Sequence, residues 1–235
     1  MVLRIGLAML QGARYEHSQA LTSAAAELDA EIEVIELRTA SEVEEQRLDA
    51  LVLPGGETTT MRKAAEAHGL LDALFAWMLA NPQRPVLGTC AGAILLSDPR
   101  NGHAPFIDAS IDRNAYGRQR DSFQSQLSLS NLEFPQVEEI SELKQVGGRG
   151  EHSPLPVNTV EERIEEESFS GVFIRAPRFL DLGLHSEVVA RDGDEVVGIR
   201  HGSRLALTFH PELTDDRRFH HWLISQASDA ANSGV

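Results

Sequence analysis

The sequence contains one cysteine among 235 residues, and no apolar run in it is as long as a membrane-spanning helix. A lone cysteine excludes an intrachain disulfide framework and is typical of a reducing cytoplasm. The missing apolar run excludes a membrane-spanning helix. The first residues enter an expected strand directly and lack the pattern of a secretory signal peptide. We therefore expect a cytoplasmic protein.

Basic residues are also scarce: 21 Lys and Arg face 36 Asp and Glu, which gives a formal net charge of −15. A general nucleic-acid binder needs a basic face, so this balance argues against that class. The acidity has two interpretations: a solvated surface suited to a salt-rich cytoplasm, where salt screens self-repulsion, or a docking face for a basic partner. The use of only two Lys against nineteen Arg favours the first.

The apolar pattern predicts an α/β fold built on a doubly wound, mostly parallel sheet flanked by helices. Short apolar or alternating runs indicate strands over residues 2–9, 31–37, 50–53 and 86–87. Helical spacing is expected over residues 17–28, 58–68, 70–79 and from 91 onward, with a short helix or loop over 41–49. The length suits one large domain.

The second half of the chain predicts an antiparallel β extension near the C-terminus. Strands are expected over residues 107–111, 122–129, 172–175 and 204–209, and a hairpin over 187–200 turns at Asp192 and Gly193. A closing helix is expected over 215–226, and His220 and His221 are interpreted as surface residues of it. Residues 133–168 carry ten Glu and are interpreted as an acidic insertion within a single domain, 1–235, and not as a second domain.

Cys90 stands between an expected strand and an expected helix, with Gly88 and Gly92 on either side. Small residues at this spacing permit the sharp turn of a nucleophile elbow, which lifts the side chain clear of the sheet. The positive end of the helix dipole favours the thiolate form, which attacks carbonyl carbons. The alternative, a small buried apolar residue, stays open on this stretch alone.

Two further stretches follow the ends of expected strands. His210 and Glu212 come after the last strand, where a histidine can act as a base and a carboxylate can orient it, although a chance surface pair is possible. Residues 54–60 place Gly55 and Gly56 after another strand, where free backbone N–H groups can hold an oxyanion. A plain turn with a threonine helix cap is the alternative for this stretch.

Together these stretches resemble class I glutamine amidotransferases, which have a flavodoxin-like sheet and a Cys-His-Glu triad. Within that class the chain is similar to the glutaminase subunits of pyridoxal 5′-phosphate synthases. The similarity is carried by residues 10–12, 54–61, 88–92, 113–119, 121–123, 173–177 and 208–214. The segments 113–119 and 173–177 are the most specific to this branch. Thr58 is a departure, because the family usually has Ser there.

The resemblance implies glutamine hydrolysis, with Cys90 as the nucleophile, His210 as general base and acid, and Glu212 as the residue that orients His210. The ammonia would pass to a separate synthase subunit in a large hetero-oligomer, and no metal or organic cofactor is implied. The other implied roles are L-glutamine binding by Gly56, Glu57, Thr58, Arg113, Ile174 and Arg175, an oxyanion hole of Gly56 and Ala91, and partner sensing by Gln11 and Gly12.

Two other functions remain open on the sequence. One is a triad glutaminase that serves a different synthase. The other is a non-catalytic glutamine-binding subunit, against which the presence of Cys90, His210 and Glu212 speaks. The nine histidines include no cluster with the spacing of a zinc site.

Overall fold

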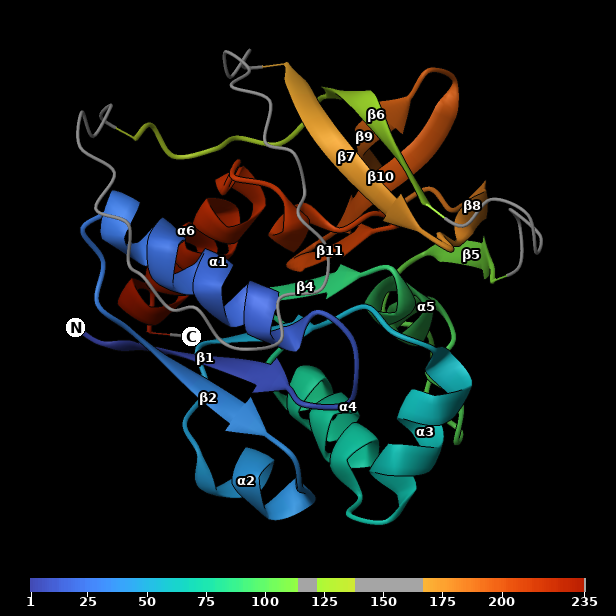
Figure 1. The fold of residues 1–235 in the computed structure, drawn as a ribbon. Coiled ribbons are helices and arrows are strands. Elements are labelled where there is room, and N and C mark those ends of the chain that lie inside the picture. Colours follow the sequence, from blue (N-terminus) through green and yellow to red (C-terminus); the bar gives the residue numbers. More distant parts are fainter. Residues whose placement is uncertain (114–121, 138–166, 235) are drawn as a thin grey trace.

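The computed structural model describes residues 1–113, 122–137 and 167–234 (Figure 1). The first half of the chain alternates strands with helices, as the apolar pattern predicts. Its elements are β1 (Leu3–Ala8), α1 (Arg14–Glu27), β2 (Ile32–Leu37), α2 (Ala40–Glu45), β3 (Ala50–Leu53), α3 (Thr58–Glu66), α4 (Leu70–Ala80), β4 (Val86–Thr89) and α5 (Ala91–Ser97).

The second half is mostly β structure and ends in a long helix. Its elements are β5 (Ala109–Asp112), β6 (Ser122–Leu129), β7 (Ser168–Ile174), β8 (Arg178–Leu182), β9 (Glu187–Asp192), β10 (Glu195–His201), β11 (Arg204–Leu207), the short 3-10 helix η1 (Pro211–Leu213) and α6 (Arg218–Asn232).

One nine-stranded sheet crosses the molecule in the order β2-β1-β3-β4-β11-β10-β9-β6-β7. The first five strands in that order run parallel. The remaining four are joined antiparallel to β11 and to one another. The α/β fold with a mostly parallel core and an antiparallel extension is therefore confirmed. A separate pair, β5 and β8, lies beside this sheet.

Helices cover both faces of the parallel strands. In Figure 1, α1 and α6 lie side by side on one face, and α2, α3, α4 and α5 lie on the other. Each face has its own apolar core, the first containing Leu21, Phe219 and Trp222 and the second containing Met61 and Phe75. Because the five strands are parallel, the loops that follow β1, β3, β4 and β11 meet at one edge of the sheet.

Several element boundaries differ from the sequence-based expectation. Strand β8 was not anticipated, and β7 begins four residues earlier than the expected strand at 172. Helix α6 begins at Arg218, three residues later than expected, and the backbone N–H of Arg218 donates to Oδ1 of Asp216 at 3.1 Å. It then continues past the expected end at 226 to Asn232.

The prediction that His220 and His221 lie on the surface is wrong. Both are buried, with exposed fractions of 0% and 4%. The reason is packing, since residues 218–224 are all buried where α6 lies against α1 and the sheet. Nε2 of His221 lies 2.7 Å from Oε2 of Glu27 on α1.

Most of the expected acidic insertion, residues 138–166, lies outside the described residues. A single domain with an insertion at 133–168 therefore stays a prediction. Within the described ranges, no helix is both long and apolar enough to cross a membrane.

Candidate active site

Cys90 lies at a strained turn between β4 and α5. Its backbone has φ 48° and ψ −106°, and its N–H donates to the carbonyl of Leu207 at 2.8 Å. A Cβ at Gly92 would lie 1.9 Å from the carbonyl oxygen of Leu53, and one at Gly88 would lie 2.9 Å from the backbone of Gly92. Both glycines are therefore required by close backbone approach, as expected for a nucleophile elbow.

His210 follows β11 and is 5% exposed. The backbone N–H of His210 donates to the carbonyl of Val172 at 2.8 Å, and the ring nitrogen Nδ1 lies 2.7 Å from Oε1 of Glu212. Its other ring nitrogen, Nε2, has no hydrogen-bond partner among the residues the structure describes. That nitrogen is the one left free to exchange a proton with a neighbouring group.

His210 and Cys90 both lie close to Gly55, so they are neighbours. A Cβ built on Gly55 would lie 2.5 Å from Cε1 of His210 and 3.3 Å from Cβ of Cys90. Burial by itself would lower the pKa of His210, but Glu212 and Cys90 together hold that pKa well above its ordinary value. The protonated imidazole is thus favoured beside a sulfur atom that can carry negative charge.

Glu212 is buried between two histidines. Burial would raise the pKa of its carboxyl group, but His17 and His210 hold that pKa below its usual value. Nε2 of His17 lies 3.3 Å from Oε2 of Glu212. Sequence reasoning missed His17, although its spacing from Ala20, Leu21 and Ala24 places it on the buried stripe of α1.

The loops after β1 and β3 contact each other directly. Oε1 of Gln11 accepts the backbone N–H of Glu57 at 3.0 Å. Gly12 has φ +78°, and a Cβ there would lie 2.1 Å from the carbonyl oxygen of Gly55. Gly56 has φ +149°, and a Cβ there would lie 3.2 Å from Cβ of Gln11. The predicted partner-sensing residues and Gly56 of the predicted oxyanion hole therefore lie in two loops that contact each other.

The carboxylate of Glu57 caps α3. It accepts the backbone N–H of Thr59 at 2.9 Å and that of Thr60 at 2.7 Å, which helps to lower its pKa to about 2. The alternative of a threonine cap is therefore wrong for this helix. Nη2 of Arg113 donates to Oγ1 of Thr58 and lies 4.0 Å from Oε1 of Glu57.

The segment after β7 lies over the nucleophile. Sγ of Cys90 lies 3.8 Å from the carbonyl oxygen of Ile174. Arg175 is exposed and has φ 45°, an uncommon conformation for a side-chain-bearing residue. Ala91 begins α5 directly after Cys90. Of the motif 113–119, only Arg113 is among the described residues, and residue 121 is also outside them.

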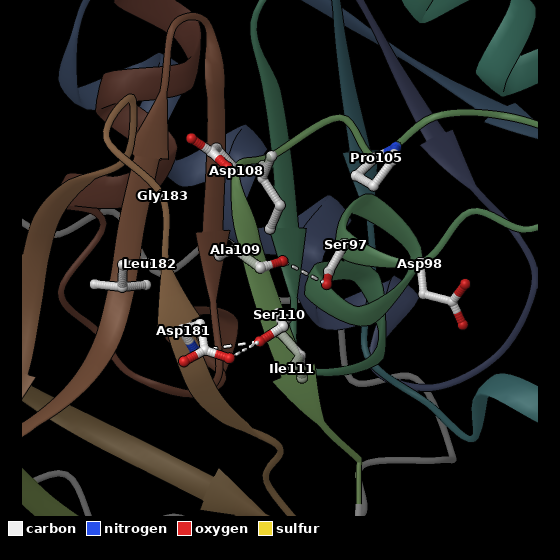
Figure 2. Close-up of a pocket in the computed structure, with 11 residues that line it drawn as sticks. Ser97, Asp98, Pro105, Asp108, Ala109, Ser110, Ile111, Asp181, Leu182 and Gly183 are labelled. Atoms are coloured by element: carbon white, nitrogen blue, oxygen red, sulfur yellow. Dashed lines mark hydrogen bonds between the residues drawn. The ribbon is translucent and has the colours of Figure 1, made fainter.

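A surface pocket of about 610 Å³ lies away from these residues, between α5, β5 and β8 (Figure 2). Oγ of Ser97 donates to the carbonyl of Ala109 at 2.8 Å across it, and Oγ of Ser110 lies 3.2 Å from Oδ2 of Asp181. Ser97 ends α5 and Cys90 precedes its start, so the pocket and the nucleophile lie at opposite ends of this helix. None of the predicted site residues lines the pocket.

The match to a known structure and to a family model places this fold and its elbow cysteine in the class of glutamine amidotransferases. A crystal structure described as a glutamine amidotransferase matches with a TM-score of 0.69 and 34% identity, covering 95% of this chain and 98% of the other. The chain belongs to the SNO glutamine amidotransferase family, whose model matches residues 7–146 and 148–229.

Relatives named "Pyridoxal 5'-phosphate synthase subunit PdxT" match over nearly the whole chain. The protein from Oenococcus oeni is 36% identical over 228 residues, which cover 95% of this chain and 96% of the relative. The protein from Thermococcus onnurineus is 36% identical over 234 residues, which cover 96% of this chain and 100% of the relative. The chain is thus an enzyme of the glutamine amidotransferase type.

Proposed function

We propose that this glutamine amidotransferase is the glutaminase subunit of a pyridoxal 5′-phosphate synthase. It hydrolyses L-glutamine to L-glutamate and ammonia, and the ammonia passes to a synthase subunit in a hetero-oligomer. The observation that carries this proposal is the buried pair of His210 and Glu212 beside Cys90, in a chain whose full-length relatives bear that subunit's name. With its single cysteine, the chain is expected to act in a reducing cytoplasm.

The triad supports a two-step hydrolysis. The raised pKa of His210 favours the form in which Nε2 already carries the proton of the Cys90 thiol, and the thiolate attacks the side-chain amide carbon of glutamine. The tetrahedral oxyanion is held by the backbone N–H groups of Gly56 and Ala91. His210 then donates its proton to the departing nitrogen, which leaves as ammonia, and a γ-glutamyl thioester remains. Water, deprotonated by His210, attacks the thioester and releases glutamate and the thiol.

The remaining predicted residues would hold the amino-acid end of glutamine. A guanidinium group pairs with an α-carboxylate in a bidentate fashion, which suits Arg113 and Arg175. Glu57 can accept from the α-ammonium, since its lowered pKa keeps it ionised. Gly56, Thr58 and Ile174 would contribute backbone and hydroxyl contacts. This chemistry requires neither a metal nor an organic cofactor.

Replacing Arg113 by alanine should weaken glutamine binding by roughly 1.5–3 kcal/mol, the worth of a charge-assisted hydrogen bond, and so raise KM roughly 10- to 150-fold. Arg175→Ala should have an effect of the same order. Steady-state glutaminase kinetics measure both. Arg100→Ala is the matched control, because Arg100 is an exposed arginine that pairs with Asp98. Unchanged KM and kcat in both site variants would make the two arginines structural.

The synthase partner is expected to switch the enzyme on. A free glutaminase would release ammonia to water, so we infer that the oxyanion hole is incomplete until docking. The Gly56 peptide is the adjustable part, because glycine permits several backbone conformations. A partner that docks at Gln11 and Gly12 can change the conformation of this peptide, because Gln11 accepts the backbone N–H of Glu57 and Gly12 lies against Gly55.

The test mixes the chain with candidate synthase subunits and follows glutamine-dependent formation of pyridoxal 5′-phosphate. We expect kcat for glutamine to rise at least about tenfold with the partner, because each oxyanion donor is worth on the order of 10²–10³ in rate. Gly56→Ala should blunt the rise, whereas Gly193→Ala, at a positive-φ turn with open space around it, should not. Ammonia delivery to another acceptor would instead favour a glutaminase of a different synthase.

A further inference from the structure

Two buried histidines stand behind the proposed triad, and the mechanism above does not use them. His17 on α1 and His220 on α6 are both 0% exposed. Nδ1 of His17 lies 3.0 Å from Nε2 of His220. Nε2 of His17 faces two oxygens, Oγ1 of Thr89 at 3.1 Å and Oε2 of Glu212 at 3.3 Å. Thr89 immediately precedes the nucleophile, so His17 contacts both halves of the site.

The charge of the two histidines follows from their surroundings. Burial lowers the pKa of His17, with Glu212 opposing and His210 adding to the effect. Burial also lowers the pKa of His220 well below its ordinary value, helped by His17, Arg217 and His221. Both rings are therefore neutral at neutral pH, and each carries a single N–H.

One arrangement of protons fits these contacts best. A proton on Nε2 of His17 is favoured beside the ionised carboxylate of Glu212, although this N–H is hydrogen-bonded to Oγ1 of Thr89 and Oε2 of Glu212 has no hydrogen-bond partner among the described residues. Nδ1 of His17 is then an acceptor and receives the N–H at Nε2 of His220. Nδ1 of His220 is left without a proton, and it is also the nitrogen that has no partner in the described part of the chain. An unprotonated Nδ1 without a partner is consistent with His220 donating from Nε2 to His17.

We propose that His17 is a positioning residue for the triad: its Nε2, which is hydrogen-bonded to Oγ1 of Thr89, packs 3.3 Å from Oε2 of Glu212 and so keeps Oε1 directed at Nδ1 of His210. His220 in turn holds His17 in the tautomer that can donate. This inference rests on the proposed roles of Cys90, His210 and Glu212. In this arrangement His220 donates to His17, and His17 donates to Thr89 beside the carboxylate of Glu212.

The arrangement has an energetic purpose. A buried carboxyl group favours its neutral form, which would leave His210 without a charged partner. The electrostatic interactions of His17 and His210 with the carboxylate, together with the hydrogen bond from His210, oppose this and hold the pKa of Glu212 below its usual value. A neutral donor suits the position, because a second buried cation beside His210 would disfavour the imidazolium on which proton transfer depends.

Removal of the His17 side chain should shift the pH dependence of catalysis. Without the N–H of His17, the pKa of Glu212 rises, and Glu212 becomes protonated at a pH where it was ionised before. His210 then loses its charged partner, so the acidic limb of kcat/KM moves to higher pH. The titratable and charged groups around His17 are Glu212 and His210 near η1 and His220 on α6, with Arg217 and His221 beside His220.

The test compares His17→Gln with His17→Asn in the glutaminase–synthase complex. A glutamine amide reaches the position of Nε2 and keeps a donor there, whereas an asparagine amide reaches only the position of Nδ1. We expect His17→Asn and His17→Leu to lower kcat roughly 10- to 100-fold, the loss found when outer-shell partners are removed from metal sites. KM should change little, and His17→Gln should recover most of the loss.

A second readout does not depend on glutamine turnover. The pH dependence of Cys90 alkylation by iodoacetamide, measured on the isolated chain, reports the state of the thiol–imidazole pair. Its profile should move in His17→Asn and His17→Leu and should stay close to wild type in His17→Gln. His221→Leu is the matched control, because His221 is buried on α6 and paired with Glu27 instead of Glu212. It should reduce thermal stability and leave the pH profile unchanged.

The outcomes separate the two hypotheses. If wild-type protein has no glutaminase activity with any synthase subunit, the proposed function fails. If wild type is active and the Gln and Asn variants share one kcat and one pH profile, the positioning role of His17 is refuted. A His17→Leu variant that does not fold leaves the decision to the Gln and Asn pair.

Discussion

Replacement of Cys90 by serine is expected to abolish glutamine hydrolysis while leaving the fold and glutamine binding largely intact. The exchange replaces sulfur by oxygen at a 5%-exposed position and opens little space. A serine hydroxyl is a far weaker nucleophile at neutral pH, and the variant loses the Cys90 sulfur that helps to raise the pKa of His210. We expect kcat to fall by at least about 10³-fold, since loss of a triad nucleophile elsewhere costs up to about 10⁶-fold.

Glutamine binding by calorimetry and thermal unfolding would show that the Cys90→Ser site is intact. Ser97→Ala is a control on the same helix, because its hydroxyl bonds the carbonyl of Ala109 at the far end of α5. Retention of more than a few per cent of activity in Cys90→Ser would remove Cys90 from the mechanism. Family membership would be unaffected by that result.

Glu212→Gln is expected to lower kcat roughly 10³-fold. The neutral amide cannot stabilise the imidazolium of His210, and an acid-to-amide change in a serine-protease triad costs about 10⁴-fold. The amide also has its own N–H groups. Its oxygen can take only one of the two sites occupied by Oε1 and Oε2, so it leaves a donor facing either His210 or His17.

The matched control for this variant is Glu27→Gln. Glu27 also accepts from a histidine on α6, with Oε2 2.7 Å from Nε2 of His221, yet it does not contact His210. Glutaminase assays over pH should show a normal profile for Glu27→Gln and a strongly reduced kcat for Glu212→Gln. Equal effects in the two variants would mean that Glu212 acts only through packing.

The sequence by itself determined the parts of this protein that depend on near neighbours in the chain. The elbow is readable because close backbone approach at Gly88 and Gly92 leaves room only for glycine. The hairpin at 187–201 is readable because alternation and an Asp-Gly turn are local signals. His210 and Glu212 are two residues apart, so their pairing could be predicted once the end of the preceding strand was located.

Only the tertiary structure decided which residues lie behind the triad. His17 and His220 are 203 residues apart in sequence, and they meet because α1 and α6 pack on the same face of the sheet. The same packing buries His221, which looks like a surface residue when its helix is considered alone. Burial depends on what covers a helix face, and that cover comes from distant segments, so no local pattern contains it.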